Sequence, residues 1–377
     1  MPHLYDVIVL GVGGMGSAAA FELARRGRHV LALEQFPLVH DRGSSHGHTR
    51  VIREAYYEHP AYVPLVRRAY SRWYDLEQRT GRHLLTLTGC LNVGPPGGEL
   101  VSGVRASARE HGLFVEELPG HEIGRRFPAF QFDSDVVGVL EHRAGFLYVE
   151  ECVRAYCDAA MNLGATIKAN EPVQTWKPVG AAVEVRTAKS TYHAANLVVT
   201  AGAWASQMLG DIGVPLTVMR QVLQWFAPVD PALFRRDRFP VYLAETPAGA
   251  FYGLPAVDAR GHKAARHYGA PELSGPDAVD RAVFPEDELP VRAFLKRHLP
   301  GADGPRTAAQ TCLYTLTPDR HFVIDVHPGF PQVALAAGFS GHGFKFASAV
   351  GEVLADLVDR GETKRDIAMF RAGRFAG

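Results

Sequence analysis

Short apolar runs alternate with amphipathic stretches along the chain, and glycines stand at many of the boundaries. Near the start, an apolar run at 5–10 predicts a β-strand, an alanine-rich stretch at 15–26 predicts a helix, and an apolar run at 29–34 predicts a second strand. A strand, a helix and another strand within about thirty residues form a β-α-β unit, which is typical of nucleotide-binding folds.

Further along, apolar stripes at helical spacing predict helices, and alternating or β-branched runs predict strands. The predicted helices span residues 61–80, 100–111, 149–163, 286–299 and 343–360. The predicted strands span residues 84–93, 175–192, 197–200, 217–229, 251–254, 263–269, 322–326 and 333–337.

Strand–glycine junctions of the nucleotide-binding type occur near residues 10, 200 and 338, and the segments between them have the pattern of antiparallel sheet. We therefore predict a mixed α/β protein with one discontinuous nucleotide-binding domain and a second, mainly antiparallel β domain inserted in two pieces. The predicted nucleotide-binding domain comprises residues 1–85, 148–212 and 320–377, and the predicted inserted domain comprises residues 86–147 and 213–319.

The first strand–helix junction carries the spacing G-x-G-x-x-G in the sequence GVGGMG. Gly11 allows a tight turn, Gly13 lets the backbone approach a pyrophosphate at the positive end of the helix, and Gly16 lets the helix pack on the strand. Glu34, at the end of the second strand, is placed to accept hydrogen bonds from ribose hydroxyls. A chance glycine turn is the alternative, but the strand, the helix and the acidic residue together favour a dinucleotide site. The motif does not distinguish FAD from NAD.

Composition agrees with a soluble globular protein of about two domains. Of the 377 residues, 47% are hydrophobic and 21% are charged, which excludes a disordered chain, a coiled coil and a fibrous repeat. The 40 basic side chains balance 40 acidic ones, so we expect neither a nucleic-acid partner nor a membrane surface. No apolar run reaches the length of about 18 residues that a membrane span needs, and we expect a cytoplasmic protein. The four cysteines form no C-x-x-C pair, so we expect neither a disulfide framework nor a metal site.

A basic loop follows the second predicted strand and carries two arginines and two histidines between His46 and Arg53. A solvated basic surface loop is the common fate of such a run. Gly47 brings the backbone close to a neighbour, however, and Arg50 and Arg53 flank an apolar pair, which indicates partial burial. His46 and His48 have no local carboxylate or cysteine beside them, so a metal site is disfavoured. An anion-binding pocket is the better interpretation.

Two later strands alternate so that chemically active side chains share a face. Lys263 and His267 lie on one face of the first, and Cys312 and Tyr314 on one face of the second. Each pattern taken alone also fits an ordinary strand, exposed in the first case and buried in the second. Lys345 opens the last predicted helix, where its charge opposes the helix dipole. A residue placed against its local preference suggests a role, such as holding an anion.

These segments together resemble one family of flavoproteins. The resemblance extends in the same order over nearly the whole chain. It is carried by the glycine fingerprint, the loop SSHGHTRVIREAY, the segment FYGLP, the Lys263/His267 pair, the segment TCLYTLTPDRHFVIDVHP and the closing AAGFSGHGFKFASAVGEVL. The family is that of the monomeric sarcosine oxidases, within the D-amino-acid-oxidase-like flavoproteins; N-methyltryptophan oxidases and L-pipecolate oxidases share the motifs. The resemblance implies a Rossmann-like, FAD-binding fold of the glutathione-reductase type.

The resemblance also implies roles for single residues. Cys312 matches the cysteine that links FAD covalently through its 8α-methyl group. Arg53 and Lys345 match the residues that bind the substrate carboxylate, and Lys263 matches the lysine that promotes reaction with O₂. Further active-site residues implied in this way are His267, Tyr252 and Arg50. Further cofactor-binding candidates are His46, Gly341 and Gly343. Two positions depart from the family pattern, because His48 stands where we expect Asp and Leu243 where we expect Met.

The implied activity is FAD-dependent oxidation of a secondary amino acid, sarcosine or another N-methyl amino acid, by O₂. The products are an imine, then formaldehyde and the primary amino acid, together with H₂O₂. A cationic pocket suits this reaction because it binds a carboxylate and favours the neutral amine. Three alternatives stay open: a cyclic imino acid such as L-pipecolate or L-proline as substrate, a dehydrogenase with another electron acceptor, and a nucleotide-binding protein without catalysis. The family further implies a monomer.

Overall fold

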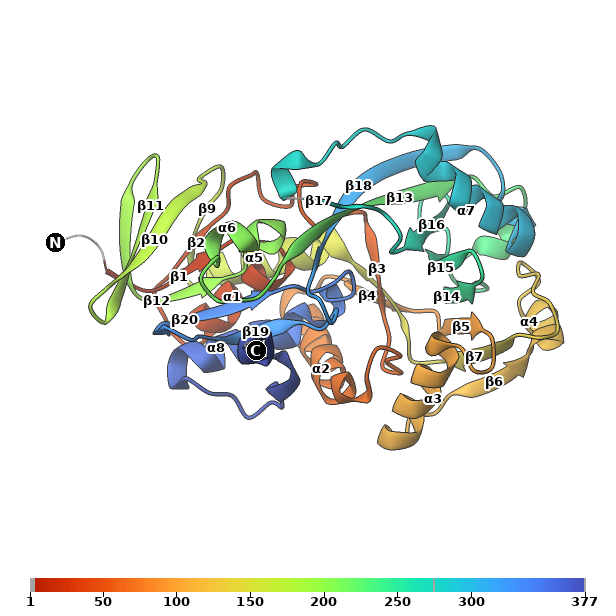
Figure 1. The fold of residues 1–377 in the computed structure, drawn as a ribbon, viewed down its shortest axis with the longest axis horizontal. Coiled ribbons are helices and arrows are strands. Elements are labelled where there is room, and N and C mark those ends of the chain that lie inside the picture. The colour runs from red at the N-terminus through yellow and green to blue at the C-terminus, as the bar shows by residue number, and fades with distance from the viewer. Residues whose placement is uncertain (1–3, 274, 376–377) are drawn as a thin grey trace.

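The computed structural model describes residues 4–273 and 275–375, which build three β-sheets (Figure 1). The first sheet runs in the order β10 (Val173–Val179), β11 (Ala182–Thr187), β12 (Thr191–Val199), β1 (Leu4–Leu10), β2 (Val30–Leu33) and β9 (Thr166–Lys168). Beside β12 lies β20 (Phe330–Ala337), which pairs in turn with β19 (Val323–His327). Strands β12, β1, β2 and β9 are parallel, and the pairing of β1 with β2 is the one that the β-α-β pattern predicted.

Strands β1 and β2, in the middle of this sheet, are buried on both faces, which explains why β1 is apolar throughout its centre. Val7 and Val9 of β1 belong to a core formed with four helices. Ile8 and Leu10 belong to a second core on the opposite face, with β11, β12 and the short helix α6 (Ala205–Met208). The four helices are α1 (Gly14–Arg25), α2 (Val63–Thr80), α5 (Val149–Asn162) and α8 (Ala347–Arg360).

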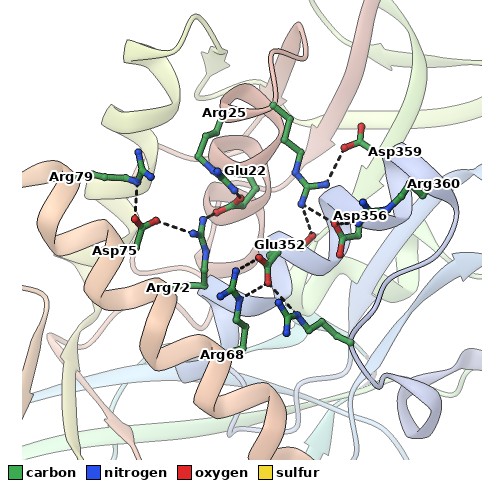
Figure 2. Close-up of polar contacts among 12 residues, drawn as sticks. Glu22, Arg25, Arg68, Arg72, Asp75, Arg79, Glu352, Asp356, Asp359 and Arg360 are labelled. Atoms are coloured by element: carbon green, nitrogen blue, oxygen red, sulfur yellow. Dashed lines mark hydrogen bonds and ion pairs between the residues drawn. The ribbon is translucent and has the colours of Figure 1, made fainter.

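An ion-pair network ties α1, α2 and α8 together (Figure 2). Glu22 of α1 has no exposed surface and bonds both Arg25 and Arg72, the latter from α2. Arg72 also binds Asp75, and Arg68 of α2 binds a carboxylate of α8. Because the glycine turn forms the start of α1, the network holds the helix that follows this turn against its neighbours.

The second sheet is mainly antiparallel and lies at the other end of the molecule (Figure 1). Its order is β17 (Glu272–Leu273), β13 (Thr217–Phe226), β16 (His262–His267), β15 (Gly249–Leu254), β14 (Val241–Thr246), β5 (Cys90–Gly94), β7 (Val137–Glu141) and β6 (Glu116–Pro119), and β18 (Arg306–Leu316) pairs along β13. Within this sheet, β14 and β5 are the only parallel pair that the described residues form. Three helices contact strands of this sheet: α3 (Glu99–His111), α4 (Gly120–Arg126) and α7 (Pro285–His298).

A small third sheet lies between the other two (Figure 1). It contains β3 (Thr49–Ile52), β8 (Gly145–Tyr148) and β4 (Leu85–Leu87), all antiparallel. The predicted single strand at 84–93 is wrong, because a turn at Gly89, with φ of 75°, divides it into β4 and β5 in different sheets. Positive φ is a conformation that glycine adopts at little cost.

The mixed α/β fold class is confirmed, with differences in detail. Pattern reasoning missed β3, which it treated as part of the basic loop, and it missed several short strands: β6, β7, β8, β9, β14 and β17. The predicted helix at 343–360 begins with a 3₁₀ turn at Phe344–Phe346 before α8. The division into two domains stays a prediction, and its end residues 1–3 and 376–377 lie outside the described part of the chain. Within the described part, no helix is both long and apolar enough to cross a bilayer.

Candidate active site

Two adjoining cavities are lined by residues from all three sheets. The larger measures about 1490 Å³ when counted out to its open mouth, and the smaller about 460 Å³. Arg50, Tyr314 and Gly341 line both cavities, so the two meet at these residues. A ligand in the larger cavity and a ligand in the smaller one could therefore touch each other.

The glycine turn forms one end of the larger cavity. Gly11 has φ of 82°, and a Cβ atom there would lie 2.6 Å from the carbonyl oxygen of Thr200. A Cβ atom on Gly16 would lie 1.8 Å from the carbonyl oxygen of Gly11, so only glycine permits this contact between turn and helix. The turn leaves the N-terminus of α1 facing the cavity, where Gly14 N donates to Ser45 Oγ at 2.9 Å. Backbone N–H groups at a helix N-terminus suit an anion.

Glu34 lines the same cavity from the end of β2. One oxygen accepts from Val12 N at 2.8 Å, and the other accepts from Phe36 N at 3.1 Å. The buried carboxylate therefore fixes the glycine turn from beneath while its edge faces the cavity. The predicted ribose contact and this structural role are compatible, since a carboxylate has about four lone-pair positions.

Cys312 of β18 supplies a buried thiol to the wall of the larger cavity. Burial alone would raise the pKa of this thiol, but the nearby His46 and the charges of Arg50 and Lys263 outweigh it and lower the pKa to about 7. His46 Nε2 donates to Gly43 O at 3.1 Å, and its buried Nδ1 has no hydrogen-bond partner among the described residues. A thiol of lowered pKa beside cations is the environment of a reactive cysteine.

The smaller cavity contains the two predicted carboxylate-binding cations, together with an acid that sequence analysis missed. Arg53 Nη2 lies 2.8 and 2.6 Å from the two carboxylate oxygens of Glu58, and Arg53 Nη1 donates to Ala55 O at 3.1 Å. Lys345 Nζ donates to His342 O at 2.6 Å and to Tyr56 Oη at 3.3 Å. All of these side chains are buried or nearly so.

Charges and burial set the protonation of this cluster. Burial alone would raise the pKa of Glu58, but Arg53, His342 and Lys345 together lower it to about 2, so Glu58 is ionised. Burial and the charge of Arg53 lower the pKa of Lys345 to about 7, although Glu58 opposes them. Burial likewise lowers the pKa of His267 to about 3, so its imidazole is neutral near pH 7.

His267 and Tyr252 also line the smaller cavity. His267 Nδ1 lies 3.2 Å from Tyr314 Oη, and the rings of His267 and Tyr252 pack edge to face at 6.0 Å. Leu243, on the neighbouring strand β14, lines the same cavity. The lining residues are Arg50, Val51, Arg53, Glu58, Leu243, Tyr252, His267, Tyr314, Gly341, His342 and Lys345.

Lys263 lies behind the basic loop. Its Nζ donates to Gly47 O at 2.7 Å and to Thr49 O at 2.9 Å, and it lies 5.1 Å from the ring centre of Trp225. Burial and Arg50 lower its pKa well below the ordinary value, while Glu150 opposes them. Lys263, His46 and Gly16 are predicted site residues that do not appear among the described residues lining either cavity.

His48, one of the two residues that depart from the family pattern, lies on the same basic loop. His48 has φ of 67°, and its backbone N–H donates to Glu150. Its imidazole Nδ1 lies 3.5 Å from Asp258 Oδ2, and burial lowers its pKa. His48 therefore contacts the segment that precedes β16, the strand of Lys263, and the described lining of the smaller cavity does not include His48.

Comparison with known proteins decides the family. Residues 6–357 match the family model described as FAD dependent oxidoreductase. The chain belongs to this family. It is 43% identical to the monomeric sarcosine oxidase of Streptomyces avermitilis over 100% of this chain and 99% of that one, and 40% identical to that of Arthrobacter sp. over 98% and 96%. It is 36% identical to an N-methyl-L-tryptophan oxidase of Yersinia pestis over 98% and 99%.

Solved structures agree on the fold of this FAD-dependent oxidoreductase. The open form of NikD, an unusual amino acid oxidase essential for nikkomycin biosynthesis, has a TM-score of 0.86, with 25% identity over 98% of this chain and 97% of that one. The L-proline dehydrogenase of P. horikoshii has a TM-score of 0.86 with 22% identity over 100% and 99% of the two chains. At that identity the second likeness shows the fold alone.

The residues of the larger cavity fit FAD. The glycine turn leaves backbone N–H groups for a pyrophosphate, and Cys312 offers a thiol of lowered pKa in the wall of the same cavity, two residues before Tyr314, which lines both cavities. Gly341 is also required, because a Cβ atom there would lie 2.4 Å from the ring of Tyr314. A Cβ atom on Gly343 would lie 2.4 Å from Phe339, so this glycine permits the chain to pass close to that ring.

Four residues of the smaller cavity region were missing from the predicted site: Tyr56, Glu58, Tyr314 and His342. Three of them lie within the motifs that carry the family resemblance, so their neighbours could have indicated them. Glu58 has no such signal. Its role depends on a fold that buries it against Arg53, and an acid five positions after an arginine is common in any sequence.

Proposed function

We propose that the protein is an FAD-dependent oxidase of secondary amino acids, with sarcosine or another N-methyl amino acid as substrate and O₂ as electron acceptor. The observation that carries the proposal is the smaller cavity, which holds Arg53 and Lys345 and adjoins the larger cavity at Arg50 and Tyr314. A carboxylate needs such cations, and the neighbouring cavity suits the cofactor of the family.

The substrate carboxylate is bound by Arg53 and Lys345. Arg53 offers a planar fork of donors and Lys345 a compact charge, which together hold a carboxylate in one orientation. Because Glu58 already binds Arg53, the incoming carboxylate exchanges with Glu58 or shares the guanidinium with it. The affinity for substrate therefore depends on how much more strongly Arg53 binds the substrate carboxylate than it binds Glu58.

The amine must be neutral before it can give up electrons. The cations Arg50, Arg53 and Lys345 disfavour an ammonium group near them, and His267 is neutral and can accept a hydrogen bond from the amine. FAD held in the larger cavity would supply the two-electron acceptor for oxidation of the amine to an imine, with O₂ as the final acceptor and H₂O₂ as the product. Water then hydrolyses the imine of an N-methyl substrate to formaldehyde and the primary amino acid.

Two further roles belong to this proposal. Cys312 is the attachment point of FAD through the 8α-methyl group, and its lowered pKa favours the thiolate that such a bond requires. Lys263, fixed by two backbone carbonyls, stabilises the negative charge that develops when O₂ accepts electrons. We expect the protein to act as a monomer.

The deciding experiment measures H₂O₂ release by the purified holoenzyme with sarcosine, N-methyl-L-tryptophan, L-proline and L-pipecolate, and with glycine as the primary-amine control. We expect the highest kcat/KM with sarcosine or a related N-methyl amino acid. Release only from L-proline or L-pipecolate would replace the N-methyl substrate by a cyclic one. Anaerobic bleaching of the flavin without H₂O₂ under air would indicate a dehydrogenase, and no bleaching with any compound would contradict the proposal.

A further inference from the structure

Tyr56 contacts both cations of the smaller cavity. Its side chain has no exposed surface and lies three residues after Arg53 in the chain. The guanidinium carbon of Arg53 lies 4.2 Å from the centre of the Tyr56 ring, and Lys345 Nζ lies 3.3 Å from the hydroxyl. One buried tyrosine therefore touches two charged groups that come from distant parts of the sequence.

The direction of each hydrogen bond follows from His342. Its Nε2 lies 3.1 Å from Arg320 O, and a carbonyl only accepts, so Nε2 carries the proton. Burial lowers the pKa of His342 to about 4, so the ring is neutral and its Nδ1 is an acceptor. Tyr56 Oη lies 2.6 Å from this Nδ1 and donates to it. The lone pairs of the hydroxyl are thus left to accept from Lys345.

This arrangement restricts Lys345 to one position. Two of its three N–H donors are used, one by His342 O at 2.6 Å and one by Tyr56 Oη, which leaves one donor for a ligand in the cavity. Arg53 is restricted similarly, since its guanidinium lies against the rings of Tyr56 and Tyr57, at 4.2 and 4.8 Å from their centres. Contacts of a cation with an aromatic face are stronger when both are desolvated.

We propose that Tyr56 is the positioning residue of the carboxylate site, with its ring holding Arg53 and its hydroxyl holding Lys345. This inference rests on the proposed function, because it assigns a substrate carboxylate to these two cations. Tyr56 acts through them and does not line the smaller cavity among the described residues. Its loss therefore weakens binding of any carboxylate ligand and leaves the rate of flavin reduction at saturating substrate nearly unchanged.

The test compares Tyr56→Phe with Tyr62→Phe in the flavin-loaded protein. Tyr62 is a matched control because it is equally buried, packs on Tyr56 at 4.7 Å and bonds a different histidine, His321, at 3.1 Å. Calorimetric titration with a simple carboxylate that lacks an amine, such as (methylthio)acetate, gives Kd. We expect about a three- to tenfold higher Kd in Tyr56→Phe and an unchanged Kd in Tyr62→Phe.

Two further measurements separate positioning from a general structural effect. Anaerobic stopped-flow reduction with the preferred substrate should show a limiting rate within about twofold of the wild-type rate in Tyr56→Phe, with the half-saturating concentration raised. In a Lys345→Met background, Tyr56→Phe should add almost nothing to Kd, because the group that the hydroxyl holds is gone. Tyr56→Leu should raise Kd more than Tyr56→Phe does, because it also removes the ring under Arg53.

An unchanged Kd in Tyr56→Phe, an equal rise in Tyr62→Phe, or a full additional effect in the Lys345→Met background would each overturn the proposal. If Tyr56→Phe is recovered without flavin, His342→Phe tests the same hydroxyl, since it keeps an aromatic ring but removes the acceptor that orients Tyr56. The Kd of the carboxylate should be higher in His342→Phe as well, and an unchanged Kd in that variant would also overturn the proposal. Failure of the wild-type protein to bind any carboxylate would instead refute the proposed function.

Discussion

Arg53 and Glu58 form a buried ion pair in which both carboxylate oxygens lie within 2.8 Å of one guanidinium nitrogen. The cation assigned to the substrate carboxylate thus has an internal partner of the same chemical class as that carboxylate. Taking an arginine out of water is costly without such a partner. Glu58 therefore stabilises the folded protein and competes with the ligand.

Replacing Glu58 separates these two effects. In Glu58→Gln the buried Arg53 loses its counter-charge, so the free energy of unfolding should fall by about 3–5 kcal/mol. A bound carboxylate would replace the missing charge, so a saturating carboxylate inhibitor should raise Tm more in this variant than in the wild type. Melting curves with and without inhibitor measure both effects. Glu54→Gln is the control, because Glu54 pairs with Arg67 instead, and an equal inhibitor-induced shift in all three proteins would contradict the prediction.

The protonation of Lys345 predicts a pH dependence of ligand binding. Its pKa of about 7 lies below the ordinary lysine value because the group is buried and lies near Arg53. As pH rises through 7, Lys345 loses its charge, so the Kd of a carboxylate without an amine should rise up to about tenfold per pH unit above 7. The lowered pKas of His267 and His342, at about 3 and 4, keep both rings neutral throughout this range. Titrations between pH 6 and 9 measure the slope, and Lys345→Met should abolish it.

A flat profile in the wild-type protein would show that Lys345 stays charged.

The lowered pKa of Lys345 also makes the stability of the folded protein depend on pH. The unfolded chain binds a proton at this lysine up to about pH 10, whereas the folded chain releases it near pH 7. Lys345 therefore lowers the free energy of unfolding by an amount that grows as pH falls from about 10 to about 7 and stays constant below that pH. Lys345→Met should therefore gain stability relative to the wild type on acidification from pH 9 to pH 6.

The network of Figure 2 predicts unequal effects for two arginines of α2. Arg72 pairs with the fully buried Glu22, and Arg79 pairs with Asp75 near the surface. Arg72→Met should lower the free energy of unfolding by about 3 kcal/mol, because Glu22 would keep only Arg25 as a partner. Arg79→Met should change it by less than about 1 kcal/mol. Urea denaturation followed by circular dichroism compares them, and similar losses would show that Glu22 does not depend on Arg72.

The parts of the site that pattern reasoning predicted are those whose chemistry is local. The glycine fingerprint is one turn between a strand and a helix, and Lys263 and His267 share a face simply because they are four residues apart on β16. The same reasoning missed β3, since a strand that contains Arg50 between Thr49 and Val51 has too little apolar pattern to be recognised.

The parts of the site and fold that pattern reasoning did not predict depend on contacts between distant segments. Glu58 became part of the site because the fold buries it beside Arg53, His342 and Lys345. The split of the predicted strand at 84–93 depends on β4 pairing with β8 while β5 pairs with β14 and β7, and no single segment contains that information. Likewise, the lowered pKa of Cys312 requires charges from the basic loop and from β16.

The role assigned to Cys312 predicts that the flavin stays with the polypeptide after denaturation. Acid-precipitated wild-type protein should give a yellow pellet, and Cys312→Ser should release the colour into the supernatant or purify without flavin. Cys157→Ser is the control, since this buried thiol lies outside both described cavity linings and burial raises its pKa to about 12. Absorbance of pellet and supernatant after precipitation measures the distribution, and a colourless wild-type pellet would disprove the covalent link.

The roles of Lys263 and Lys345 can be separated because they belong to different half-reactions. Lys345 lines the smaller cavity and holds the substrate, whereas Lys263 is fixed by Gly47 O and Thr49 O behind the loop. Removing one preorganised charge from a developing anion typically costs about 10²–10³-fold in rate. Lys263→Met should therefore slow reoxidation of the reduced enzyme by O₂ by about that factor, while anaerobic reduction by substrate should slow far less.

Lys345→Met should show the converse, with weakened substrate binding and nearly normal reoxidation. Stopped-flow absorbance of the flavin follows each half-reaction alone, so the two variants can be compared without steady-state assumptions. Normal reoxidation with impaired reduction in Lys263→Met would move Lys263 to the amine side of the reaction. Arg50 would then be the better assignment for the oxygen-reactive charge, because it is the cation that lines both cavities and, like Lys263, is held by backbone carbonyls, those of Ser44 and His46.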